Sequence, residues 1–190
     1  MIRKADPEFK VSLAGNFHKE LEADIYDYCI PIGASYPAEV LARRAQNNLP
    51  TTYYTCCTEA FPNTFTFSDP AEAAWMSYYS AKDHLDGYLR WAYNSWPKEP
   101  LLDSRFEAWA GGDTYLVYPG ARSSIRFEKL IEGVQAHEKI TILRKEFTDK
   151  KNKTGFKKLE KMLSTFNLRD FPEVPAAETV NKANKILNSL

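Results

Sequence analysis

The sequence has 190 residues, of which 44% are hydrophobic and 14% aromatic, enough for one folded domain with a core. Its 25 basic and 25 acidic side chains balance, so the charge predicts no attraction to nucleic acid or to an anionic membrane surface. The first residues lack the apolar core of a signal peptide, and no apolar run is long enough to span a bilayer. The chain as written is therefore expected to be soluble, unexported and directed at a neutral or compact ligand.

The first half of the sequence alternates short β-rich runs with one helical pattern. Residues 9–15 and 24–30 are predicted to form buried strands, because each apolar run stops at a glycine or proline. Pro37 opens a predicted helix over residues 38–47, whose apolar residues fall at helical spacing. Residues 51–57 are rich in β-forming side chains and give the next strand.

The second half continues this alternation. A cap signal at Ser68-Asp69-Pro70 precedes a predicted helix over residues 71–79, and residues 87–93 form a fourth strand candidate. After an irregular loop, Ser123 and Ser124 cap a long amphipathic helix. Three helices are expected in this last part of the chain, over residues 125–147, 156–163 and 176–190.

Strands that alternate with helices at this interval predict an α/β fold with a parallel sheet, either a barrel or an open doubly wound sheet. No glycine-rich phosphate turn opens any of the helices, which weakens the nucleotide-binding version, and no cofactor is expected. About four βα units are present, whereas a closed barrel of the TIM type needs eight. We therefore expect half of a (β/α)8 barrel over residues 1–147, followed by peripheral helices over residues 148–190.

The three cysteines do not suggest a disulfide framework. Cys29, Cys56 and Cys57 are odd in number, and a bond between the adjacent pair would be strained. A nucleophilic role for Cys56 is a weaker reading than a structural one, because no accompanying His and Asn arrangement is evident in the sequence.

Functional residues of a parallel barrel collect where each strand ends, and the densest such point lies around residues 90–96. There Trp91, Tyr93 and Trp96 alternate with polar side chains. Indole rings can cover the C–H face of a pyranose while amide and guanidinium groups bind its hydroxyls, so this mixture is typical of a carbohydrate site. Packing of the same rings against helices is the competing explanation.

Several separate segments, all in the right order, resemble the catalytic domain of glycoside hydrolase family 123, which is also catalogued as domain of unknown function 4091. The resemblance extends over about residues 5–145. The matching segments are residues 10–15, 54–57, 62–65, 86–96, 103–106, 112–120 and 123–128.

This resemblance implies a (β/α)8 barrel that removes β-linked N-acetylgalactosamine, with the 2-acetamido group of the substrate as nucleophile. Such chemistry uses an adjacent Asp-Glu pair, which the family carries just upstream of the region matched here. No adjacent Asp-Glu pair occurs in the 190 residues. The chain is therefore expected to be the C-terminal half of the barrel, with no catalytic residue of its own and no activity when isolated.

The residues expected to bind the sugar are assigned from strand-end position and chemistry. One of two tyrosines would hydrogen-bond the acetamide carbonyl, two tryptophans would form the floor and wall of the pocket, and two asparagines and an arginine would hold hydroxyls. These substrate-binding candidates are Asn16, Tyr54, Arg90, Trp91, Tyr93, Asn94 and Trp96.

Some charged residues have two readings. Arg90 could instead form a structural ion pair with Asp86, Asp103 or Asp113, and the last two carboxylates could simply fix loops. The acidic and histidine residues within 83–86 could suggest metal ligands, but a second histidine cluster is missing from the sequence and no metal is expected.

Two other functions stay open. The chain could be a non-catalytic carbohydrate-binding or interaction module whose partner is an N-acetylated amino sugar glycan. It could also be an independent half-barrel that forms a homodimer, because strand edges after Val11 and Tyr93 would otherwise be unpaired.

Overall fold

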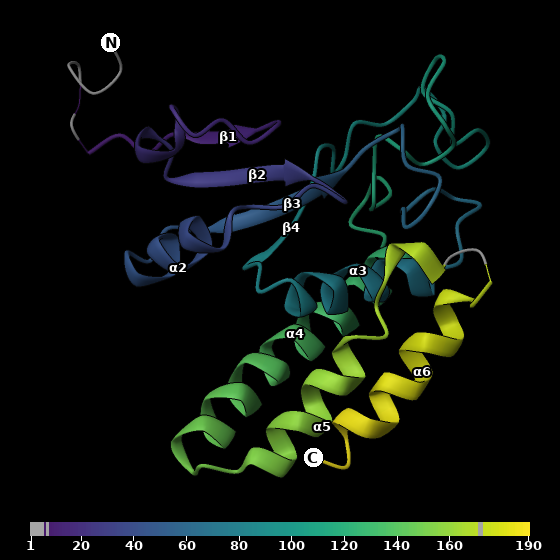
Figure 1. The fold of residues 1–190 in the computed structure, drawn as a ribbon. Helices are drawn as coiled ribbons and strands as arrows, with labels where there is room; N and C mark the ends of the chain where they lie inside the picture. Colours follow the sequence, from purple (N-terminus) through teal and green to yellow (C-terminus); the bar gives the residue numbers. More distant parts are fainter. Residues whose placement is uncertain (1–5, 7, 171–172) are drawn as a thin grey trace.

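A computed structural model describes residue 6 and residues 8–170 and 173–190, and within them the chain forms a parallel sheet backed by helices (Figure 1). Neighbours in the sheet are also neighbours in sequence, since the strand order is β1-β2-β3-β4. All three pairings are parallel. The strands are β1 (Ser12–Ala14), β2 (Asp27–Pro31), β3 (Thr51–Thr55) and β4 (Gly87–Arg90).

The helices lie close to the predicted positions, and side-chain caps fix two of their starts. Ser124 accepts a hydrogen bond from the backbone N–H of Phe127, and Asn152 accepts one from that of Gly155. The first five helices of the described chain, counting a 3-10 turn, are η1 (Glu22–Asp24), α2 (Ala38–Gln46), α3 (Ala71–Lys82), α4 (Ile125–Asp149) and α5 (Lys153–Leu163). They are followed by η2 (Leu168–Asp170) and α6 (Ala176–Leu187).

Helices α2 and α3 cover the same face of the sheet. Tyr53 of β3 points to this side, where its hydroxyl donates a hydrogen bond to the carbonyl oxygen of Met76 in α3 at 2.7 Å. Arg44 of α2 lies over the ring of Tyr28 in β2, with 5.9 Å from the guanidinium carbon to the ring centre. Side chains that alternate with these, such as Thr52, belong to the opposite face and keep access to solvent.

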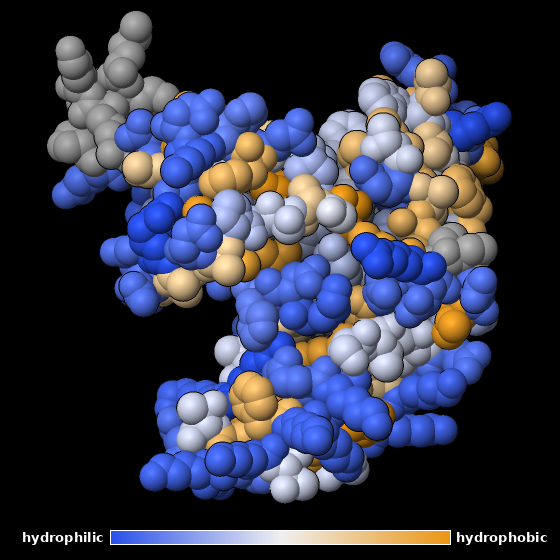
Figure 2. Space-filling model, viewed as in Figure 1, coloured by the Kyte–Doolittle hydropathy of each residue, from blue (hydrophilic) through white to orange (hydrophobic). Residues whose placement is uncertain are grey.

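Helices α4, α5 and α6 form a layer beneath α3 (Figure 1), and their viewer-facing surface is largely hydrophilic (Figure 2). Phe166, between α5 and α6, is fully buried and stacks on Tyr78 of α3 with 4.6 Å between ring centres. The Tyr78 hydroxyl also donates a hydrogen bond to the side chain of Asn184 in α6 at 2.5 Å. The last two helices therefore share one core with the strand-bearing part of the chain.

The prediction of an α/β fold with a parallel sheet is confirmed, but the prediction that the first strand is buried is wrong. Ser12 and Ala14 are exposed, and Leu13 is partly buried. Strand β1 lies at the edge of the sheet, where one neighbour and one covered face cannot bury alternate side chains. None of the helices in the described parts of the chain has the length and hydropathy to cross a membrane.

Candidate functional site

The carboxyl ends of the four parallel strands face one edge of the sheet, as described for residues 8–170, and long loops continue from it (Figure 1). The loop after β3 spans residues 56–70 and the loop after β4 spans residues 91–124. All seven predicted substrate-binding residues belong to this edge. Asn16 follows β1, Tyr54 lies near the end of β3, and the other five lie at the end of β4 or just after it.

Arg90 is buried in an ion pair with Asp113. Only 4% of the arginine side chain and none of the aspartate side chain is exposed, and the Nη2 to Oδ1 distance is 2.5 Å. The other terminal nitrogen, Nη1, donates a hydrogen bond to Oδ1 of Asn63 at 3.0 Å. Of the two roles open to Arg90, the geometry favours the structural one over binding of a sugar hydroxyl.

Asn63 connects the loop after β3 to this ion pair. Its side-chain amide donates hydrogen bonds to the carbonyl oxygens of Cys56 and Glu59, at 2.7 and 2.6 Å. Its Oδ1 accepts hydrogen bonds from the backbone N–H of Thr64 and from Arg90. One fully buried amide therefore fixes the path of the loop. Sequence reasoning gave Asn63 no role, although it lies in a segment that matched the family.

Glu72, in the first turn of α3, supports the same loop from below. Its carboxylate accepts hydrogen bonds from the backbone N–H groups of Asn63 and Asp69, at 2.8 and 3.1 Å. Burial nevertheless raises the pKa of this carboxyl above its ordinary value, because removal from water penalises the charged form more than these bonds favour it.

Glu72 should therefore reduce stability as the pH rises. A carboxyl with a raised pKa in the folded state holds its proton more tightly there than in the unfolded chain, so the stabilisation is lost as the pH rises through that raised pKa. In denaturant unfolding, the native chain should lose more stability than Glu72→Gln between the ordinary glutamate pKa and neutral pH. Parallel pH profiles would show that this carboxyl is not the source of the titration.

Arg126, at the start of α4, is a second buried arginine and ties the two loops together. Its Nη1 donates hydrogen bonds to the carbonyl oxygen of Gly112, at 2.9 Å, and to that of Thr64. Gly112 has a φ of +76°, and a Cβ there would lie 2.6 Å from Arg126 Nη1, so only glycine fits. The backbone N–H of Thr66 adds a bond to the carbonyl oxygen of Gly111 at 2.8 Å.

Four aromatic side chains are exposed on this framework. Trp91 is 45% exposed and directs its indole N–H to Asp113 Oδ1 at 3.4 Å. Trp96 is 37% exposed, and its indole N–H donates a hydrogen bond to the carbonyl oxygen of Val117 at 2.7 Å. The other two are Tyr93 and Trp109. Sequence reasoning missed Trp109, which falls between two segments that matched the family; an aromatic residue in so polar a loop was the available signal.

The remaining predicted residues also lie at this edge. Tyr93 packs edge-on against Phe127, with 5.7 Å between ring centres, and Asn94 is exposed beside it. Asn16 is exposed, and its backbone carbonyl accepts a hydrogen bond from the Tyr28 hydroxyl at 3.0 Å. Burial raises the pKa of Tyr54, so this phenol is a hydrogen-bond donor at neutral pH.

Carboxylates near the edge are poor proton donors. Glu59 lies in the loop after β3; burial raises its pKa, but hydrogen bonds from the Cys56 N–H and the Thr58 hydroxyl outweigh burial and leave the pKa below its usual value. A general acid needs a raised pKa instead. Within the described ranges, no group of three or more His, Cys, Asp or Glu side chains could hold a metal ion. The arrangement suits binding better than acid catalysis.

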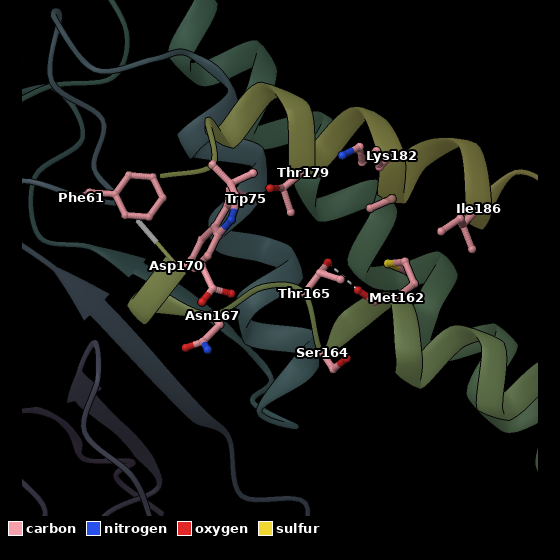
Figure 3. Close-up of a pocket in the computed structure, with 12 residues that line it drawn as sticks. Phe61, Trp75, Met162, Ser164, Thr165, Asn167, Asp170, Thr179, Lys182 and Ile186 are labelled. Atoms are coloured by element: carbon pink, nitrogen blue, oxygen red, sulfur yellow. Dashed lines mark hydrogen bonds between the residues drawn. The ribbon is translucent and has the colours of Figure 1, made fainter. Parts of the chain in front are cut away.

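A cavity of about 470 Å³ lies elsewhere, in the helical layer (Figure 3). Trp75 of α3, Met162 of α5 and Thr179 of α6 contribute to its mainly apolar lining. None of the seven predicted residues lines it. This cavity is therefore separate from the strand-end site.

Comparison with known proteins identifies the family. The model of the glycoside hydrolase 123 catalytic domain matches residues 1–143. A similar solved structure is a family 123 glycoside hydrolase from Clostridium perfringens, studied for glycolipid glycan hydrolysis, with 25% identity and a TM-score of 0.73. The alignment covers 95% of this chain but 35% of that one, so the chain spans about a third of its length. No curated protein matched significantly. The 190-residue chain belongs to the glycoside hydrolase family 123 catalytic domain.

Proposed function

We propose that the chain is the sugar-binding half of a glycoside hydrolase that removes β-linked N-acetylgalactosamine. Family membership and the similarity to an enzyme of glycolipid glycan hydrolysis support a carbohydrate substrate. The observation that carries the proposal is the set of exposed rings, Trp91, Tyr93 and Trp96, held at the carboxyl edge of a parallel sheet. Flat apolar rings beside amide groups match the alternating C–H and hydroxyl surface of a sugar.

In this proposal each residue type has one role. Trp91 and Trp96 form the floor and wall of the pocket, and Tyr54 or Tyr93 donates a hydrogen bond to the acetamide carbonyl. The exposed asparagines, Asn16 and Asn94, hold hydroxyls. Arg90 acts indirectly: its ion pair fixes Asp113, whose carboxylate in turn accepts the indole N–H of Trp91.

The proposed chemistry is substrate-assisted and retaining. The acetamido oxygen of the substrate attacks the anomeric carbon, one carboxylate stabilises the resulting oxazolinium ion, and a neighbouring carboxylic acid protonates the departing oxygen. Water then opens the oxazolinium ring. Because the sequence contains no adjacent Asp-Glu pair, the proposal places this pair upstream of these residues, in the other half of the barrel.

Three features of the sheet support a half-barrel. Its order is sequential, both crossover helices lie on one face, and β1 and β4 each have a single neighbour among the described strands. A doubly wound sheet would instead carry helices on both faces. We propose that further βα units complete the barrel. A homodimer in which two copies pair these edges is the alternative, and analytical ultracentrifugation distinguishes it from a monomer.

A direct test uses a chromogenic β-N-acetylgalactosaminide. The isolated chain should release no chromophore, whereas a protein extended upstream to eight strands and an adjacent Asp-Glu pair should be active. Replacing that pair by Asn-Gln in the longer protein is the matched control and should abolish the release. Hydrolysis by the isolated chain would show that the catalytic assignment is wrong and that Asp27, Asp103 or Asp113 must be reconsidered.

A non-catalytic carbohydrate-binding module is the second candidate. The finding that favours it is a preformed aromatic surface, fixed by buried arginines, in a sequence without the acid pair. Both candidates predict sugar binding, but this one predicts no activity in the extended protein.

A further inference from the structure

Trp109 extends the aromatic surface beyond the predicted residues. It lies in the loop after β4, 40% exposed, and its ring centre is 5.6 Å from that of Trp91, with 49° between the ring planes. Rings this close leave no room for a sugar between them, so together they form one bent apolar surface. An indole is about as wide as a pyranose, and two indoles side by side therefore extend past a single sugar ring.

Both rings are held in place before any ligand binds. Trp91 is oriented by Asp113, as described above. On the Trp109 side, the backbone N–H of Trp109 donates to the carbonyl oxygen of Phe106 at 3.0 Å, and that of Asp113 donates to Ala110 at 3.0 Å. A rigid aromatic surface loses little conformational entropy on binding, which favours affinity.

The direction of the extension follows from the proposed reaction, on which this inference rests. An enzyme that removes a terminal N-acetylgalactosamine meets further sugars only on the leaving-group side of the bond that is broken. We propose that Trp109 binds the second ring of a β-linked glycan, as a specificity residue for the leaving group. The ligand class is thus a disaccharide or longer glycan instead of a single amino sugar.

Titration calorimetry on the 190-residue chain tests this with two probes, methyl β-N-acetylgalactosaminide and the β-linked disaccharide N-acetylgalactosaminyl-galactose. The disaccharide should bind about tenfold more tightly, since an aromatic contact is worth up to roughly 1.5 kcal/mol. Trp109→Ala should remove this preference and leave the affinity for the monosaccharide unchanged. Trp109→Phe should retain part of the preference.

Phe156→Ala provides the matched control, because Phe156 is similarly exposed but lies on α5, in a different part of the fold. It should change neither affinity. Equal affinities of the native chain for both probes, or equal losses for both in Trp109→Ala, would overturn the role of Trp109 while leaving sugar binding intact. Failure of the native chain to bind either probe would overturn the proposed site itself and this inference with it.

Discussion

Replacing Asp113 by alanine should lower the free energy of unfolding by about 3–5 kcal/mol, the range measured when one partner of a buried ion pair is removed. The variant leaves the Arg90 guanidinium charged in a site where it is 4% exposed. It also frees the indole N–H of Trp91, which donates to the same carboxylate. Denaturant unfolding measures the loss, and it should be accompanied by a change in tryptophan fluorescence.

Asp103→Ala is the control for this variant, because Asp103 also pairs with an arginine, Arg105, but on the surface, with both side chains more than half exposed. Solvent screens such a pair, and its loss should leave stability almost unchanged. The double variant Arg90→Met with Asp113→Ala should recover much of the stability, because it removes the unpaired charge. A double variant as unstable as Asp113→Ala would contradict the buried-charge explanation.

Replacing Phe166 by alanine should cost about 3–5 kcal/mol, as expected for truncation of a large aromatic residue in a core. Phe166 is fully buried, stacked on Tyr78 and in contact with Trp75 at 5.6 Å between ring centres. Because these partners belong to α3, the loss should affect the strand-bearing part of the chain as well as the C-terminal helices. Far-ultraviolet and near-ultraviolet circular dichroism should therefore report one coincident, lowered transition.

Phe156→Ala again serves as the comparison, because a half-exposed ring on α5 should cost much less than one in the core. Two separate transitions in Phe166→Ala, with only the first shifted, would show that residues 148–190 unfold independently. That result would favour the sequence-based view of this segment as peripheral.

The order of strands and helices could be predicted because the local signals and the tertiary structure agree. Pro37 precedes α2 and Ser124 caps α4, as expected, and β-rich residues begin β3 at Thr51. Strand ends were less accurate: the fourth strand was expected to reach residue 93 but ends at Arg90. There the chain turns into a loop whose path depends on distant partners, which no local pattern encodes.

The candidate site shows the same division. Strand-end position brought the seven residues to one edge, but sequence could not choose among three acidic partners for Arg90. Nor could it show that Arg44 is fully buried, where it donates hydrogen bonds to the carbonyl oxygens of Ile25, Tyr26 and Pro50. Buried arginines look like surface residues in a sequence, because their partners are backbone atoms that carry no residue-specific signal.

The long loop after β4 is fastened at two levels, and this separates its outer turn from its base. Ser95 is joined to Thr114 by a backbone hydrogen bond of 3.0 Å, and the backbone N–H of Gly112 donates to the carbonyl oxygen of Ser104 at 2.9 Å. The intervening residues 97–103 can therefore gain or lose length at a small entropic cost, roughly 0.6 kcal/mol for each doubling of loop length. Insertions or exchanges in this turn offer a route to new glycan preferences that leaves the aromatic surface in place.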